Sequence, residues 1–189
     1  PVTEVIKIML PAIYILLIAW LVISFINALG TGQYLADQLD GVLSPEWLPL
    51  LLFLIAGIMA FCTGTSWGTF SIMLPIAGDV AAVIDISLML PSFGAVLAGA
   101  VFGDHCSPIS DTTILSSTGA ACKHIDHFIT QLPYALMTAS VAAIAYVILG
   151  FTGSVMLSLV AMALIYILFI LYLRFISEHS HYQKTSASG

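Results

Sequence analysis

The chain has 189 residues, of which 60% are hydrophobic and 7% charged, and its mean hydropathy is +1.10. Soluble domains carry about 25% charged residues, so this composition excludes a water-soluble globular enzyme. Four Lys and Arg against ten Asp and Glu give a net charge of −6, which leaves no basic face for nucleic acid. We therefore expect a chain embedded in a lipid bilayer, long enough for five or six spans of about 20 residues.

Apolar stretches predict ordinary membrane-spanning helices at residues 8–29, 128–149 and 155–175, and their one charged residue, Arg174, lies at the end of the last stretch. The Ser-rich residues 177–189 are expected to form a disordered cytoplasmic tail, so that the transmembrane domain covers residues 1–176. The chain starts at Pro1 and no signal peptide precedes its first apolar run, which indicates a fragment of a longer protein.

Two other apolar regions are interrupted by polar residues. Residues 48–62 and 70–84 are two short apolar arms around a polar, Gly-rich segment, which predicts a re-entrant hairpin. Residues 86–102 and 113–122 flank a polar segment, which predicts a discontinuous helix. Ser107 followed by Pro108 is typical of the N-cap and first position of a helix, so the second half-helix is expected to begin there.

The placement of charges indicates an orientation in the cell membrane. If residues 48–84 form a hairpin, all four basic residues fall on one side, which the positive-inside rule assigns to the cytoplasm. These residues are Lys7, Lys123, Arg174 and Lys184. Asp79 and Asp85 then fall on the other side as solvated acids. If residues 48–84 cross the bilayer once instead, Lys123 changes sides.

The two predicted breaks are where we expect the chemistry, because unwound backbone at membrane depth is costly unless it lines a cavity. Asp104 and Asp111 are predicted to bind a cation or a proton alternately, since burial favours the protonated carboxyl and a bound cation favours the carboxylate. Hydroxyl oxygens are hard ligands that suit small hard cations. The predicted neutral ligands are Thr65, Ser66, Ser107, Thr112 and Thr113. The hairpin tip, with Thr63, Gly64, Gly68 and Thr69, is expected to face the second break.

Two motifs carry a family resemblance. The segments GTSWGTFSIMLPIAG (residues 64–78) and FGDHCSPISDTTILSSTGA (residues 102–120) resemble the carboxy-terminal half of the NhaC family of sodium/proton antiporters, and the resemblance runs from about residue 30 to residue 150. It implies an all-α integral membrane protein, one half of an inverted-repeat transporter with a re-entrant hairpin and a discontinuous helix. It also implies secondary active antiport of Na⁺ and H⁺, with no enzymatic activity and no cofactor beyond the transported ions.

The resemblance leaves the substrate open. Relatives of this family also exchange malate for lactate or transport amino acids, so an exchanger of such metabolites is the alternative function. The implied partners are the lipid bilayer, the missing amino-terminal half and, in a homodimer, a second copy.

Three other interpretations use the same residues. Gly64, Ser66 and Gly68 match GxSxG, so that Ser66 and His105 could serve an intramembrane serine protease, but both aspartates are then left without a role. His105 and Cys106 are zinc-ligand types, yet no second pair has ligand spacing. His124 and His127 follow Lys123 in an expected wet interfacial loop, with a pH sensor as the alternative.

Overall fold

The structure is a computed structural model that describes residues 44–186 without a break and separate residues between 17 and 38, with side chains described as far as Leu171. Most of the first predicted span, residues 8–29, therefore lies outside the described residues, as do Lys7 and the side chains of Arg174 and Lys184.

The described part of the chain is a series of helices without a strand. The elements are η1 (Pro45–Trp47), α3 (Leu48–Thr63), α4 (Ser66–Ile84), η2 (Ile86–Leu88), α5 (Met89–His105), α6 (Asp111–Gly119), α7 (His124–Thr152) and α8 (Val155–Ser186). Four stretches are long and apolar enough to cross a membrane: Pro45–Thr63, Ser66–Ile84, Ile86–His105 and His124–Thr152. This confirms the predicted all-α membrane class.

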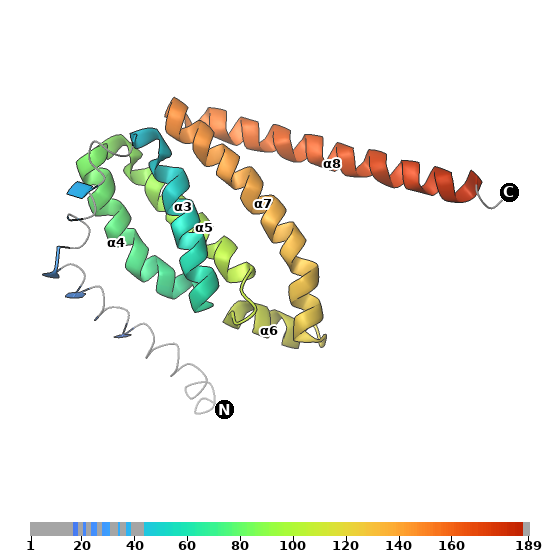
Figure 1. Cartoon of the computed structure of the whole chain (residues 1–189), viewed down its shortest axis with the longest axis horizontal. Helices are drawn as coiled ribbons and strands as arrows, with labels where there is room; N and C mark the ends of the chain where they lie inside the picture. Colours follow the sequence, from blue (N-terminus) through green and yellow to red (C-terminus); the bar gives the residue numbers. More distant parts are fainter. Residues whose placement is uncertain are drawn as a thin grey trace.

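Helices α3, α4 and α5 pack together, and α4 runs antiparallel to the other two (Figure 1). Because α3 and α5 are parallel, their carboxyl ends lie at the same end of the molecule, at the bottom of Figure 1, where α6 also lies. Helix α7 starts there and runs back along α3 and α5. The chain order thus brings both predicted breaks to one end of the bundle.

Glycines allow α3 and α5 to approach closely. A Cβ added to Gly99 would overlap the backbone of Phe53, and one added to Gly103 would overlap the backbone of Gly57. The two contacts lie four residues apart on each helix, so one row of α5 runs along one row of α3. The spacing Gly99-xxx-Gly103 therefore serves helix packing, as small residues commonly do in membranes.

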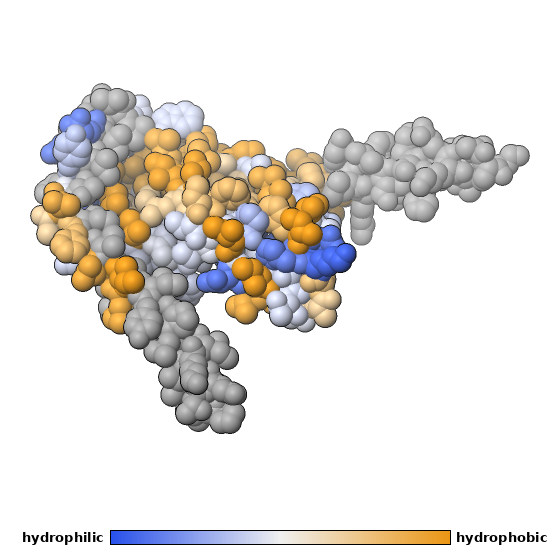
Figure 2. All heavy atoms as spheres, turned by 60° about the horizontal axis from the view of Figure 1, so that its bottom comes forward, coloured by the Kyte–Doolittle hydropathy of each residue, from blue (hydrophilic) through white to orange (hydrophobic). Residues whose placement is uncertain are grey.

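Small residues fill the interior and large apolar side chains cover the outside. The buried core is rich in alanine, including Ala56, Ala77 and Ala100, which are all 0% exposed. Leu90 is 80% exposed and Met156 76%. Figure 2 shows orange, hydrophobic residues over much of one face. Lipid tails are as apolar as leucine, so burying leucine between helices brings little advantage in a bilayer.

The helix boundaries differ from the prediction at the hairpin. The connection between α3 and α4 consists of Gly64, in the left-handed conformation with φ 69°, and the N-cap Thr65. Thr65 Oγ1 accepts a hydrogen bond from the Gly68 N–H, so α4 already begins at Ser66 and both Gly68 and Thr69 are helical. The arms have 16 and 19 residues, about 24 and 28 Å. How deeply the hairpin enters the bilayer stays a prediction.

The tail also differs from the prediction. Helix α8 continues to Ser186, so residues 177–186, which were expected to be disordered, are helical. The stretch from Val155 to Ser188 contains neither glycine nor proline, the two residues that most strongly disfavour a helix. Ser158 Oγ donates to the Ala145 carbonyl at 2.7 Å and joins α8 to α7.

Candidate functional site

The break between α5 and α6 covers residues 106–110 and centres on a turn. The Ser110 N–H donates to the Ser107 carbonyl at 3.3 Å, and Pro108 lies inside this turn, where its missing N–H costs nothing. Ser110, not the predicted Ser107, is the N-cap of α6, because its Oγ accepts from the N–H groups of Thr112 and Thr113. Asp111 occupies the first turn of α6, as predicted, where the helix dipole favours a negative charge.

Asp104 is the centre of a compact oxygen cluster. It is 2% exposed and lies in the last turn of α5. Its Oδ1 is 2.8 Å from Ser110 Oγ and its Oδ2 is 2.7 Å from Thr112 Oγ1. The two hydroxyl oxygens are themselves 2.7 Å apart. One carboxyl group and two hydroxyls, contributed by both half-helices, therefore form a closed ring of contacts.

Two buried hydroxyls of neighbouring residues, in the break and in the first turn of α6, have no hydrogen-bond partner among the described residues. Ser107 is 0% exposed and Thr113 2% exposed, and the hydroxyl oxygen of each lacks a hydrogen bond within the described part of the chain. An unsatisfied buried polar group costs about 1–3 kcal/mol, so such groups usually have a ligand, a water molecule or a further protein group to bind. Ser107 follows Asp104 closely, and its N–H donates to the Asp104 carbonyl at 3.1 Å.

The two breaks meet, as the sequence predicts. A Cβ added to Gly64 would lie 2.8 Å from the Ile109 carbonyl oxygen, so the turn between α3 and α4 sits directly on the backbone of the second break. Gly64 is required there both for its positive φ and for its lack of a side chain. The hairpin tip thus supports the α5–α6 break by backbone contact.

The hydroxyls of the hairpin tip are engaged locally. Thr63 Oγ1 donates to the Met59 carbonyl at 2.9 Å, Thr69 Oγ1 donates to the Thr65 carbonyl at 3.0 Å, and Thr65 Oγ1 caps α4. Ser66 is buried, with 8% exposed. Of the predicted neutral ligands, the structure therefore brings Thr112 into contact with the Asp104 carboxyl group, whereas Thr63 and Thr69 hold the ends of their own helices.

Asp111 stands apart from this cluster. Its side chain is exposed, and it makes no hydrogen bond to Asp104 or to any other described residue. The first position of α6 directs it away from the ring that Ser110 and Thr112 form with Asp104. In the described part of the chain the predicted aspartate pair is therefore one buried and one exposed carboxyl group.

Among the described residues, the two alternative sites, a serine protease at Ser66 and a zinc site at His105, lack the contacts that they require. His105 Nδ1 donates to the Val101 carbonyl at 2.8 Å within α5, and no hydrogen bond joins Ser66 to His105 in the part of the chain that the structure describes. Over the same residues, no three His, Cys, Asp or Glu side chains gather as metal ligands. Asp85 caps η2, and its hydrogen bonds from Ser87 lower the pKa of this exposed carboxyl group, so Asp85 is a capping residue.

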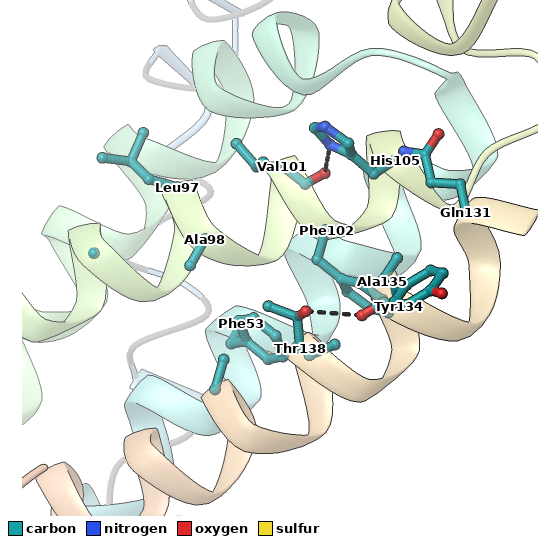
Figure 3. A pocket seen from close by; sticks show the side chains of 13 residues that line it. Phe53, Leu97, Ala98, Val101, Phe102, His105, Gln131, Tyr134, Ala135 and Thr138 are labelled. Atoms are coloured by element: carbon teal, nitrogen blue, oxygen red, sulfur yellow. Dashed lines mark hydrogen bonds between the residues drawn. The ribbon is translucent and has the colours of Figure 1, made fainter. Parts of the chain in front are cut away.

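An apolar groove of about 730 Å³ lies between α5 and α7, with Phe53 of α3 in its wall. Figure 3 shows His105 of α5 and Gln131 of α7 at the same end of this groove, away from Leu97. The residues that line the groove come from α3, α5 and α7, and the residues of the oxygen cluster are not among them.

Sequence reasoning missed two contacts of the break. Ser110 was not among the predicted ligands, although a serine before an acidic first turn is a recognised helix start. His124 was expected in an interfacial loop, which is wrong: it is the first residue of α7, and its Nε2 lies 2.7 Å from the Pro108 carbonyl oxygen. No local pattern predicts this contact, because it joins residues 16 apart.

Comparisons with known proteins agree on one family. A model of the Na+/H+ antiporter family matches residues 2–151. An uncharacterized protein of Haemophilus influenzae is 54% identical over 79% of this chain and 29% of its own length. The malate-2H(+)/Na(+)-lactate antiporter of Bacillus subtilis is 34% identical over 57% of this chain and 23% of its own length. The Na(+)/H(+) antiporter NhaC of Alkalihalophilus pseudofirmus is 28% identical over 76% of this chain and 31% of its own length.

The chain spans less than a third of the length of each of these relatives. No solved structure matches it significantly.

Proposed function

Because this chain belongs to the Na+/H+ antiporter family, we propose that it forms part of a secondary transporter in which Na⁺ and H⁺ compete for Asp104. The family is one of transporters rather than enzymes. Asp104 of α5 is the only carboxyl group that the described residues bury in the bundle, and two hydroxyls from the start of α6 converge on it.

The observation that supports this proposal most directly is that the ring around Asp104 has more contacts than its hydroxyls have protons. Three oxygen–oxygen contacts close the ring of Asp104, Ser110 and Thr112, but the two hydroxyls supply only two protons. A proton on the Asp104 carboxyl group completes the ring. When Asp104 loses that proton, the ring holds a negative charge and an unfilled contact, which a small hard cation can satisfy. The same oxygens therefore suit one proton or one cation, which is the requirement for exchange.

Further ligands would complete the cation site. The partnerless hydroxyls of Ser107 and Thr113 supply neutral oxygens from the break itself. Thr65 and Ser66 at the hairpin tip, and the exposed Asp111, are available to the ion path when the amino-terminal half of the full-length protein covers this end of the bundle. Exchange would then move the hairpin and broken helix against that half.

The orientation follows the same proposal. Lys123 lies at the end of the bundle that holds the break, and Asp85 lies at the other end (Figure 1). In a cell membrane, the positive-inside rule places the Lys123 end in the cytoplasm.

The first test is the Na⁺-dependent collapse of a preformed pH gradient in inside-out vesicles that contain the full-length protein. Asp104→Asn keeps the shape of the side chain but cannot exchange a proton, so the Na⁺-dependent rate should fall to the level of empty vesicles. Asp79→Asn, an exposed acid on α4, is the matched control and should keep the wild-type rate. Normal exchange by Asp104→Asn would overturn the proposal.

Two further readouts sharpen this test. If H⁺ competes with Na⁺ for Asp104, the wild-type KM for Na⁺ should fall as the pH rises, by up to about tenfold per pH unit while the carboxyl group is mostly protonated. Asp111→Asn separates the two aspartates: loss of exchange would include Asp111 in the ion path, and retained exchange would restrict titration to Asp104.

A second candidate function is Na⁺-coupled or H⁺-coupled exchange of malate and lactate or of amino acids. It is favoured by the similarity to the Bacillus subtilis antiporter and by the groove of about 730 Å³, which has Gln131 in its wall. In the same vesicles, gradient collapse that requires added malate, lactate or an amino acid, and that is weakened by Gln131→Leu, would support this candidate. Collapse with Na⁺ alone would exclude it.

A further inference from the structure

The α5–α6 break is held from two sides by residues that are distant in sequence. On one side, Gly64 contacts the peptide group of Ile109. On the other side, His124 contacts the neighbouring peptide group through the Pro108 carbonyl oxygen, 2.7 Å from its Nε2. Ser110, which bonds to Asp104, follows these two peptide groups directly.

The His124 ring also contacts α6. Its Nδ1 lies 3.3 Å from Ser117 Oγ, and Ser117 is 2% exposed. Ser117 Oγ is also 2.9 Å from the Ile114 carbonyl oxygen, to which it donates. One imidazole therefore joins the start of α7, the last turn of α6 and the turn that precedes α6.

The chemistry of these partners defines what His124 does. A carbonyl oxygen can only accept, so Nε2 must carry a hydrogen and donate it to Pro108. Ser117 Oγ has one proton, which it donates to the Ile114 carbonyl, so it donates none to Nδ1, and the shorter contact of the ring is the one with Pro108. The contact with Pro108 thus requires a donor at the Nε2 position and no change of charge.

We propose that His124 is a positioning residue, which holds the Pro108 peptide group so that Ser110 presents its hydroxyl to Asp104. Its effect on transport rests on the proposed function, whereas its effect on the break does not. Without the Nε2 donor, the Pro108 carbonyl loses its partner, and the turn of residues 107–110 is held by its own 3.3 Å hydrogen bond, the bonds of Ser107 and Ser110 to Asp104, and the contact with Gly64. The turn then opens more often, and the hydroxyl ligands are in place for a smaller fraction of the time.

The test measures the break directly through Cys106, which is buried, 4% exposed, and precedes Ser107. In the full-length protein, modification of Cys106 by N-ethylmaleimide is followed by mass spectrometry of its peptide. His124→Leu keeps the bulk but removes both ring nitrogens, so we expect Cys106 to react at least about fivefold faster. His124→Gln places an amide N–H near the position of Nε2 and should restore slow labelling.

His127→Leu is the matched control, because His127 lies in the first turn of α7 as well and makes no side-chain hydrogen bond to the described residues. Its Cys106 labelling should equal that of the wild type. Labelling of His124→Leu at the wild-type rate, or failure of His124→Gln to slow it, would overturn the proposal.

Transport gives a second readout. In the vesicle assay, His124→Leu should raise the KM for Na⁺ about fivefold with kcat within twofold of wild type, and His124→Gln should restore the KM. An unchanged KM in His124→Leu contradicts the positioning role. If the wild-type protein itself does not exchange Na⁺ for H⁺, the proposed function fails, while the Cys106 labelling still decides whether His124 holds the break.

Discussion

At the scale of single residues, Asp104 links the two half-helices because each of its carboxyl oxygens contacts a hydroxyl from α6. Ser110 uses its Oγ twice, as the N-cap of α6 and as a partner of Asp104. Thr112 has one role in the ring, since its Oγ1 contacts Asp104 and Ser110 but no backbone carbonyl among the described residues. Thr112 is therefore the residue at which the ring can be altered without loss of the helix cap.

Replacement of the Thr112 hydroxyl tests the ring. Thr112→Val keeps the side-chain shape and removes one hydrogen bond to a carboxyl group, which is worth about 1–2 kcal/mol. The KM for Na⁺ should rise about 5–30-fold in the vesicle assay. Thr112→Ser, which keeps the hydroxyl, should stay within about threefold of wild type. Equal KM values for the two variants would show that the Thr112 hydroxyl does not contribute to the site.

At the scale of elements, the end of α5 is positioned by its glycine contacts with α3. Phe53 and Phe102 stack at a centroid distance of 5.9 Å beside the Gly99 and Gly103 contacts. These contacts hold α5 in register along α3 up to its last turn, which carries Asp104. The place of the carboxyl group thus depends on close packing of two backbones.

A methyl group in this packing should be costly. In Gly103→Ala, the added Cβ would overlap the backbone of Gly57, and overpacking of this kind costs about 1–3 kcal/mol. The melting temperature of the full-length protein in detergent should fall. Gly119→Ala on α6 is the control: nothing lies within 4 Å of its added Cβ, and alanine favours the helix, so its melting temperature should not fall. Equal melting temperatures for the two variants would argue against the close α3–α5 contact.

At the scale of the whole molecule, the order α3, α4, α5 sends the chain along the bundle three times. Both breaks therefore lie at one end, together with Lys123, while Ser87 and Asp85 lie at the other end (Figure 1). Whether these ends face opposite sides of the membrane can be tested with cysteines, because Cys122 and Ser87 are both exposed.

The labelling experiment uses a membrane-impermeant maleimide on the full-length protein. In intact cells the reagent should modify the cysteine of Ser87→Cys but leave Cys122 unmodified, and in inside-out vesicles the pattern should reverse. Modification of both cysteines from the same side would contradict the proposed topology, in which Lys123 faces the cytoplasm.

Much of the fold was already predictable from the sequence. The lack of charge over long stretches determines the membrane class, and the polar interruptions at 63–69 and 103–112 mark the two connections around which the helices turn. The resemblance to the NhaC-type antiporters is confirmed by the family model and by the similarity to an antiporter of that name. Composition and motifs carry this information because burial in lipid restricts residue types locally.

Only the tertiary structure decided which polar residues meet. Ser107 and Ser110 are both plausible helix caps in the sequence, and the choice of Ser110 depends on the turn around Pro108. Likewise, Asp104 is buried and Asp111 exposed because the two half-helices face different neighbours. The contacts of Gly64 with Ile109 and of His124 with Pro108 join distant segments, and their geometry depends on how helices pack. Sequence patterns record the local preferences of the backbone, whereas these pairings result from packing between helices.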